Sequence, residues 1–484
     1  MPHREQNTSV AAAIVLALGA AMLVLGFTTG LGRTELAGIL LVVGVLMALI
    51  DLRVATVACF YYLGFLGDLR RILPPTLGSL DPMLLIAPAL AVIILLRQLL
   101  AGKVRIDTPS SKLVLVLLAL MSIEIFNPIQ GGFMIGFGGA VVYMVPILWY
   151  LIGKSFAQTG MDRKMVWYVL IPIATAGAAL GLFQTFVGFL SFEARWVVNF
   201  GYTALLVGRV RPFGFFVSAA EYALFLEAAA VALIARLITG RFRLPLLLLP
   251  FLLTALFFES SRGPVALLLA STCAMWGAMS RTNVGTVLRL GMAGIVMVSV
   301  LWLGLSRLKD VDLPENLEPL LKHQVDGFTD MGHSTAGSHV DMFKSGIIDG
   351  FKNPFGQGIG RTVAASRMGG ESKSSEIDIS DMFICLGLGG FIYVAIVVLG
   401  LRRAVLHFRT VRTLTSLAIV GILVGTLANW ISGALYAAAP MVCFLLGSID
   451  FPAEEPEIEQ HSRIRHRAQY GRPAMSEAAV GQES

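Results

Sequence analysis

The sequence predicts an all-α fold, a polytopic transmembrane helix bundle of about fourteen spans with one long, partly helical outer loop. The chain is 56% hydrophobic and only 14% charged, whereas a soluble domain has about 25% charged residues. Many apolar runs approach the roughly twenty residues needed to cross a bilayer. These runs are continuously apolar and do not alternate, which predicts helices and excludes a transmembrane β-barrel.

The spans are predicted from these runs in chain order. The first run is too long for the apolar part of a secretory signal and lacks a small-x-small cleavage site, so we expect a retained span. The predicted spans lie near residues 10–31, 36–50, 52–67, 82–100, 112–127, 139–158, 165–189, 214–238, 243–258, 263–280, 287–305, 379–400, 413–430 and 434–450.

Basic residues in the short connections predict the orientation of the bundle. On the side of the N-terminus the connections carry eighteen: Arg4, Arg53, Arg97, Lys103, Arg105, Lys112, Lys154, Arg163, Lys164, Arg236, Arg241, Arg243, Arg281, Arg289, Arg402, Arg403, Arg409 and Arg412. The opposite side carries seven: Arg33, Arg70, Arg71, Arg195, Arg209, Arg211 and Arg262. The positive-inside rule places both termini in the cytoplasm. Orientation thus accounts for the net charge of +6, and we expect no nucleic-acid partner.

The chain then divides into four regions. Residues 1–305 hold the first eleven spans, 306–380 form the outer loop, 381–451 hold three more spans, and 452–484 form a cytoplasmic tail. The tail is polar and is predicted to be disordered. Within the loop, helical spacing of apolar residues predicts amphipathic helices over Pro314–Phe328 and His339–Phe351, both suited to a membrane surface.

Arginines at the outer ends of spans are the first candidate site residues. The outer side has no nucleotide sugar, so an enzyme there needs a substrate already activated on a lipid, such as a lipid pyrophosphate. Guanidinium groups match phosphate oxygens with a planar fork of donors. Arg209 and Arg211 precede Pro212, and Arg262 lies in a short turn beside Glu259. The alternative is that these arginines only extend toward lipid headgroups.

Carboxylates and histidines supply the other candidates. Glu221 and Glu259 lie at the level of the arginines, where an ion pair and a substrate contact are equally open. His339 begins the second loop helix and is a candidate general base, because histidine titrates near neutral pH. Glu376, Asp378 and Asp381 are alternative bases. The cysteines stand singly and no HExxH motif occurs, so we predict neither a metal nor another cofactor.

Four short motifs follow one another in an order that resembles a known family. They are Arg211-Pro-Phe-Gly-Phe-Phe, Ser260-Ser-Arg-Gly, Pro354-Phe-Gly-Gln-Gly-Ile-Gly360 and Gly387-Leu-Gly-Gly390. With the long outer loop, this order resembles the O-antigen ligase and Wzy-type polysaccharide polymerase superfamily of bacterial inner-membrane proteins. The resemblance covers the layout of most of the chain, but specific residues only between about 180 and 400.

The resemblance implies a metal-independent glycosyltransferase that acts on undecaprenyl-pyrophosphate-linked glycans at the outer face of the inner membrane. Arg211 and Arg262 would hold the pyrophosphate and stabilise charge on the leaving group. The residues themselves, and not the resemblance, supply the other predicted roles: Arg209, Glu221, Glu259 and Asp378 as substrate contacts and His339 as the base. Membrane lipid, a chain-length regulator and an export complex are the other partners expected.

Two departures bear on which activity the resemblance implies. Family members often carry arginine where this chain has His339. Ligases typically have a His-Asn pair where this chain has Ser375-Glu-Ile-Asp-Ile-Ser-Asp381, so the ligase base does not transfer. These differences favour polymerisation of repeat units, in exopolysaccharide or O-antigen synthesis, over ligation to another acceptor.

Two other classes of function remain open. A flippase for lipid-linked oligosaccharides would suit many spans and pyrophosphate-binding arginines, but no internal repeat is present and the candidate groups lie on one face. A non-catalytic partner in a polysaccharide secretion complex would not require Arg211 or Arg262.

Overall fold

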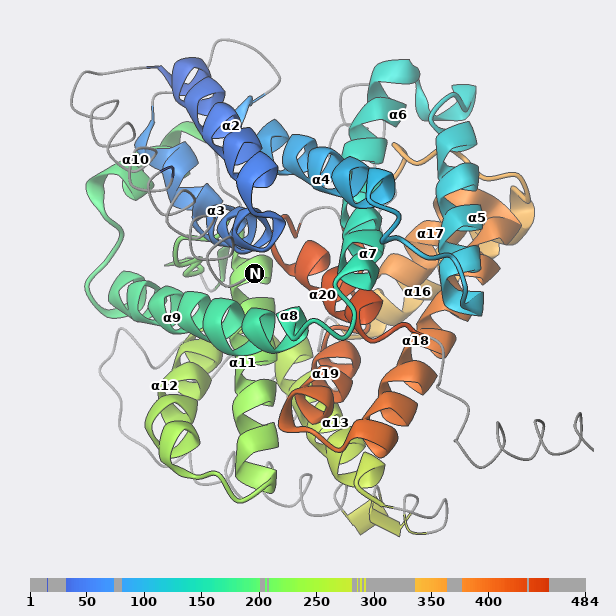
Figure 1. Ribbon diagram of the computed structural model, residues 1–484. Helices are drawn as coiled ribbons and strands as arrows, with labels where there is room; N and C mark the ends of the chain where they lie inside the picture. Colours follow the sequence, from blue (N-terminus) through green and yellow to red (C-terminus); the bar gives the residue numbers. More distant parts are fainter. Residues whose placement is uncertain are drawn as a thin grey trace, which may run out of the picture. The chain divides into compact units, whose positions relative to one another are not determined.

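The apolar runs form helices in the computed structural model of the protein (Figure 1). The structure describes residues 15, 32–73, 81–200, 205–206, 209–280, 285, 288–289, 291–292, 336–363, 377–432 and 435–451. Within these residues the fold is helical apart from one antiparallel pair of two-residue strands, β1 (Leu205–Leu206) and β2 (Arg209–Val210). The predicted helical fold class is thus confirmed for the described part of the chain.

Six helical segments are long and apolar enough to cross a membrane. Three are single helices, α2 (Arg33–Ile50), α3 (Leu52–Ile72) and α4 (Met83–Leu100). Three are composite. Phe133–Ser155 contains α6 (Phe133–Gly139), η2 (Ala140–Met144) and α7 (Val145–Ser155), and Met161–Phe186 contains α8 (Met161–Lys164), η3 (Met165–Leu170) and α9 (Ile171–Phe186). Asp378–Val411 contains α17 (Asp378–Leu386), η6 (Gly387–Gly389) and α18 (Gly390–Val411). These segments indicate a polytopic membrane protein.

The other helices are shorter or carry more charge. Of the described elements they are α5 (Pro109–Glu124), η1 (Pro128–Gln130), α10 (Ser191–Phe200), α11 (Ala219–Ile238), α12 (Arg243–Glu259), α13 (Arg262–Ala278), α16 (Ala336–Lys352), α19 (Leu414–Gly425) and α20 (Ala438–Ser448). Helices α12 and α13 have 17 residues each, and α11 contains Glu221, Glu227 and Arg236. The predicted spans 10–31 and 287–305 lie largely outside the described residues, so the number fourteen stays a prediction.

Two groups of helices make the core. Helix α11 is buried along most of its length and contacts α9, α12, α13 and α19. The other group is centred on α7 and α20, which lie side by side (Figure 1). Their backbones approach closely because each contributes a glycine to the contact. A Cβ on Gly153 would lie 2.1 Å from the Phe444 carbonyl oxygen, and one on Gly447 would lie 1.9 Å from that of Tyr150.

Gly447→Ala is therefore expected to separate α7 from α20 and to destabilise the protein by about 1–3 kcal/mol, as overpacking of a tight core does. The measurement is the thermal unfolding midpoint (Tm) of the purified full-length protein in detergent. Gly38→Ala is the control, because a Cβ there has no neighbour within 4 Å. The control should leave the Tm unchanged or raise it, since alanine favours the helix. An unchanged Tm in Gly447→Ala would contradict the close contact.

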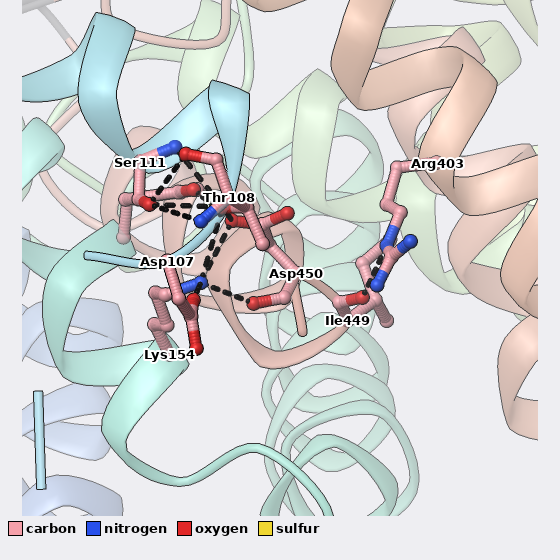
Figure 2. Close-up of polar contacts among 8 residues, drawn as sticks. Asp107, Thr108, Ser111, Lys154, Arg403, Ile449 and Asp450 are labelled. Carbon is pink, nitrogen blue, oxygen red and sulfur yellow. Dashed lines mark hydrogen bonds and ion pairs between the residues drawn. The ribbon is translucent and has the colours of Figure 1, made fainter. Parts of the chain in front are cut away.

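Two clusters of buried polar contacts each join residues from a single predicted side of the membrane. At the predicted cytoplasmic side, the Lys154 ammonium donates to the Asp450 carbonyl oxygen at 2.6 Å and forms ion pairs with Asp107 (2.9 Å) and Asp450 (3.1 Å) (Figure 2). At the predicted outer side, Asp81 pairs with Arg33 at 2.8 Å and with Arg70 at 2.6 Å. This grouping agrees with the two predicted sets of connections.

The predicted outer loop is described in part. Helix α16 (Ala336–Lys352) confirms the second predicted loop helix, whereas Pro314–Phe328 lies outside the described residues. The helix packs on α17 through its glycines, because a Cβ on Gly346 or Gly350 would lie 2.8 Å from the Cβ of Ser380 or Phe383, respectively. Val340 and Ile348 remain about half exposed. The chain divides into two compact units after Asp450, close to the predicted start of the tail.

Candidate functional site

Arg211 and Glu259 form the centre of the candidate site. The Arg211 guanidinium pairs with the Glu259 carboxylate, donates from Nε to the Glu259 carbonyl oxygen at 3.2 Å, and also donates to the Ser261 hydroxyl. The Glu259 side chain is fully buried, but the Arg211 side chain keeps 23% of its surface exposed. The ion pair that the sequence left open is therefore present, and the Arg211 side chain remains partly exposed.

The turn between α12 and α13 shapes this centre. Ser260 has a left-handed backbone (φ 72°) and ends α12. The Ser261 amide donates to Glu259 at 3.0 Å, and its hydroxyl donates to the same carboxylate at 3.0 Å. Because that hydroxyl is engaged with Glu259, it does not cap α13, which begins at Arg262. Arg211 contacts Ser261, the N-cap of α13, and therefore lies beside the start of that helix. The N-terminus of a helix attracts anions.

A buried glutamine holds the loop that carries Arg211. Gln184, in α9, accepts hydrogen bonds from the Phe213 and Gly214 amides at 3.0 and 2.9 Å. Its side-chain amide donates to the Gly214 carbonyl oxygen at 3.0 Å and to Glu193 at 2.7 Å. Burial raises the pKa of Glu193, although the hydrogen bonds from Leu190 and Gln184 oppose that rise. The motif Arg211–Gly214 is thus a fixed loop and not an open connection.

Helix α3 holds the other end of the same loop. Arg71 donates to the Phe216 carbonyl oxygen at 2.5 Å, and its guanidinium lies 3.9 Å from the centre of the Phe213 ring. A Cβ on Gly67 would lie 2.3 Å from the Phe216 carbonyl oxygen, so only glycine allows the loop to approach α3 this closely. The loop is therefore clamped between α3 and α9.

Glu221 and Asp378 both bind backbone amides of the segment that joins α19 to α20. Glu221 accepts hydrogen bonds from the Ala437 and Val217 amides at 2.5 and 3.3 Å. Asp378 accepts from the Ile431 amide at 2.6 Å and from the Tyr393 hydroxyl at 3.1 Å. Both carboxylates are buried and both hold the segment between α19 and α20. The structure gives them a structural role, and their predicted contact with substrate stays a prediction.

The glycine-rich motif before α17 is a backbone turn. Gly356 and Gly358 have positive φ angles of 88° and 94°. The buried side chain of Gln130 accepts from the Gly360 amide at 2.8 Å and donates to the Ile125 carbonyl oxygen at 2.6 Å. A Cβ on Gly358 would lie 2.5 Å from the Gln130 side-chain oxygen. The turn therefore packs around one glutamine, and it joins the predicted outer loop to η1 (Pro128–Gln130).

Comparison with known proteins adds nothing to this geometry. No family model and no curated protein matches the chain. The resemblance to polysaccharide ligases and polymerases therefore rests on the four motifs, their order and the predicted layout of the chain. All four lie in described residues: the clamped loop at Arg211, the turn at Ser261, the glycine turn at Gly358, and η6 (Gly387–Gly389) with the start of α18.

For the remaining predicted site residues, Arg209, Arg262 and His339, the structure gives the backbone position. Arg209 lies in β2 and His339 in α16, but the side chains of both lie outside the described part of the structure. Arg262 begins α13 directly after Ser261. Among the described residues no three His, Cys, Asp or Glu side chains gather as metal ligands would. The sequence did not identify Gln184, Glu193 or Gln130, for which an amide or a carboxylate within or between apolar runs was the only signal. It counted Arg71 only among the basic residues that predict orientation.

Proposed function

We propose that this protein is a membrane glycosyltransferase that joins lipid-pyrophosphate-linked glycan units at the outer face of the bacterial inner membrane. One observation carries the proposal: a partly exposed arginine, Arg211, is fixed beside the N-terminus of α13, where Arg262 begins the helix. Fixed guanidinium groups and helix amides together form a preorganised site for phosphate oxygens.

The chemistry follows from where negative charge develops. When a sugar hydroxyl displaces the lipid pyrophosphate, the new glycosidic bond forms as the bond to the pyrophosphate oxygen breaks, and charge grows on that oxygen. Arg211 and Arg262 would stabilise that charge, and Glu259 would keep Arg211 in place. The acceptor hydroxyl must lose a proton, and His339 at α16 is the proposed base. Polymerisation of repeat units remains the preferred activity, with ligation to another acceptor as the alternative.

Lipid-linked glycans in cells lacking this protein test the proposal. Cells complemented with wild type or Arg262→Ala would be compared for the length and the membrane side of undecaprenyl-linked glycans. Single units that accumulate at the outer face without polymer indicate a polymerase. Long chains that stay on the lipid indicate a ligase. Units trapped at the cytoplasmic face would overturn the proposal in favour of a flippase.

Arg262→Lys provides a sharper test of the phosphate contact. A lysine keeps the charge but cannot present two parallel donors, so we expect activity at least about tenfold below wild type, close to that of Arg262→Ala. Glycan transfer would be measured in membranes matched for protein amount. Arg241→Lys is the control, because it exchanges an exposed arginine on the opposite predicted side. Full activity in Arg262→Lys would exclude a bidentate contact.

A further inference from the structure

A large basic cavity opens between α3, the end of α4 and α8, and none of its lining residues belongs to the candidate site. Its volume is about 1390 Å³. The charged residues that line it are five cations and one carboxylate: Arg53, Arg97, Lys103, Arg163, Lys164 and Asp51. Pockets for ligands usually measure about 300–1,000 Å³, so this cavity is large enough for more than a small soluble anion.

The single carboxylate does not neutralise the cations. Asp51 caps α3, where it accepts hydrogen bonds from the Arg53 amide at 2.8 Å and the Val54 amide at 3.3 Å. The cations come from three connections that the sequence places on the side of the N-terminus. Their convergence in one cavity leaves a concentrated positive charge, whereas cations that only extend toward headgroups would be spread around the bundle.

The cavity also has an apolar wall. Val54, Val57 and Ala58 of α3 line it, together with Tyr61, whose hydroxyl donates to the Tyr168 carbonyl oxygen at 2.5 Å. A soluble anion would gain nothing from this wall. An amphiphile would place its charged group on the cations and its chains along α3.

The side-chain amide of Gln98, in α4, is an independent indication that the cavity binds a polar ligand. It lines the cavity and is only 1% exposed. Neither its amide nitrogen nor its amide oxygen has a hydrogen-bond partner among the described residues. Buried amides are normally paired, and this one can both donate to a phosphate oxygen and accept from a hydroxyl.

We propose that this cavity binds an acidic phospholipid with two phosphate groups from the leaflet on the side of the N-terminus. The phosphates lie among the five cations, Gln98 bonds the headgroup, and the acyl chains follow the apolar wall. Basic pockets between transmembrane helices bind lipids of this class in general. Residues 1–31 contain one carboxylate, Glu5, beside Arg4, so that segment supplies no net negative charge to the cavity.

Lipid titration followed by native mass spectrometry tests the proposal on the full-length protein in neutral detergent. The probes are cardiolipin, phosphatidylglycerol and inorganic pyrophosphate. We expect cardiolipin to bind most tightly, and the double variant Arg163→Gln/Lys164→Gln to weaken it about tenfold or more. Both side chains are exposed, so the Tm of the lipid-free variant should not change.

The control is Arg105→Gln/Arg241→Gln, which removes the same charge from exposed residues on the same predicted side, outside the cavity. It should leave cardiolipin affinity within about twofold of wild type, because screened charges act over only about 8 Å at physiological salt. An equal loss in the control would overturn a defined site in favour of general attraction. Pyrophosphate binding as tight as that of cardiolipin would overturn the lipid assignment.

Gln98→Leu tests the headgroup contact separately. Because Gln98 has no hydrogen-bond partner among the described residues, its loss should not lower the Tm of the lipid-free protein. It should weaken cardiolipin binding severalfold and reduce the rise in Tm that the lipid causes. Unchanged lipid affinity in Gln98→Leu would contradict the proposed contact.

Discussion

Arg211→Met is expected to abolish glycan transfer and to destabilise the protein, whereas Arg211→Met/Glu259→Gln should regain stability without regaining activity. The single variant leaves the fully buried Glu259 carboxylate without its cation. Loss of one partner from a buried pair costs about 3 kcal/mol, and we take this low value because Arg211 is partly exposed. In the double variant the neutral amide no longer requires a cation, so most of that cost should disappear.

The activity should behave differently, because the phosphate contact needs the guanidinium itself. Removal of one preorganised donor to a developing negative charge lowers rates by about 10²–10³. The measurements are the Tm in detergent and the transfer of lipid-linked glycan at matched protein amount. Glu259→Gln alone is the matched control: it keeps Arg211 and should retain more activity than either variant without it. Restored activity in the double variant would make Arg211 a structural residue only.

The sequence predicted the parts of this site that depend on local pattern. The apolar runs predicted the membrane helices, and helical spacing predicted α16, whose end at Lys352 follows from Pro354. The proximity of Arg211 to Glu259 was anticipated because both lie at the predicted outer ends of spans. In each case the prediction needed only the spacing of apolar residues or the predicted depth of a residue in the membrane. It did not require knowledge of which helices are neighbours.

The contacts that fix the site could not be predicted in the same way. Gln184 reaches Gly214, 30 positions away, and Gln130 reaches Gly360, 230 positions away. Such a partner depends on how helices pack, which one sequence does not specify. A polar side chain in an apolar run is costly and so indicates that some partner exists, but it does not identify that partner. Glu221 illustrates the same limit, since its partners are backbone amides at the start of α20.

Lys154→Met is expected to give the largest loss of stability on the predicted cytoplasmic side. Lys154 and Asp450 are each only 3% exposed in their side chains, and they join the start of α5, the end of α7 and the end of α20 (Figure 2). The Asp450 carboxylate also accepts hydrogen bonds from the Thr108 and Tyr150 hydroxyls. Without the ammonium, the buried Asp450 carboxylate loses its cation, and the loss of one partner from a buried pair costs about 3–5 kcal/mol.

Partial rescue by a second substitution distinguishes this charge effect from lost packing. Lys154→Met/Asp450→Asn removes both charges and leaves an amide that can still accept from Thr108 and Tyr150, so its Tm should lie well above that of Lys154→Met. Asp450→Asn alone should be milder than Lys154→Met, because the ammonium keeps its ion pair with Asp107 at 2.9 Å and its contact with the carbonyl oxygen of residue 450. Lys112→Met, on an exposed face of α5, is the control and should be neutral. A double variant no more stable than Lys154→Met would show that the lysine stem, and not the buried pair, holds these three helices together.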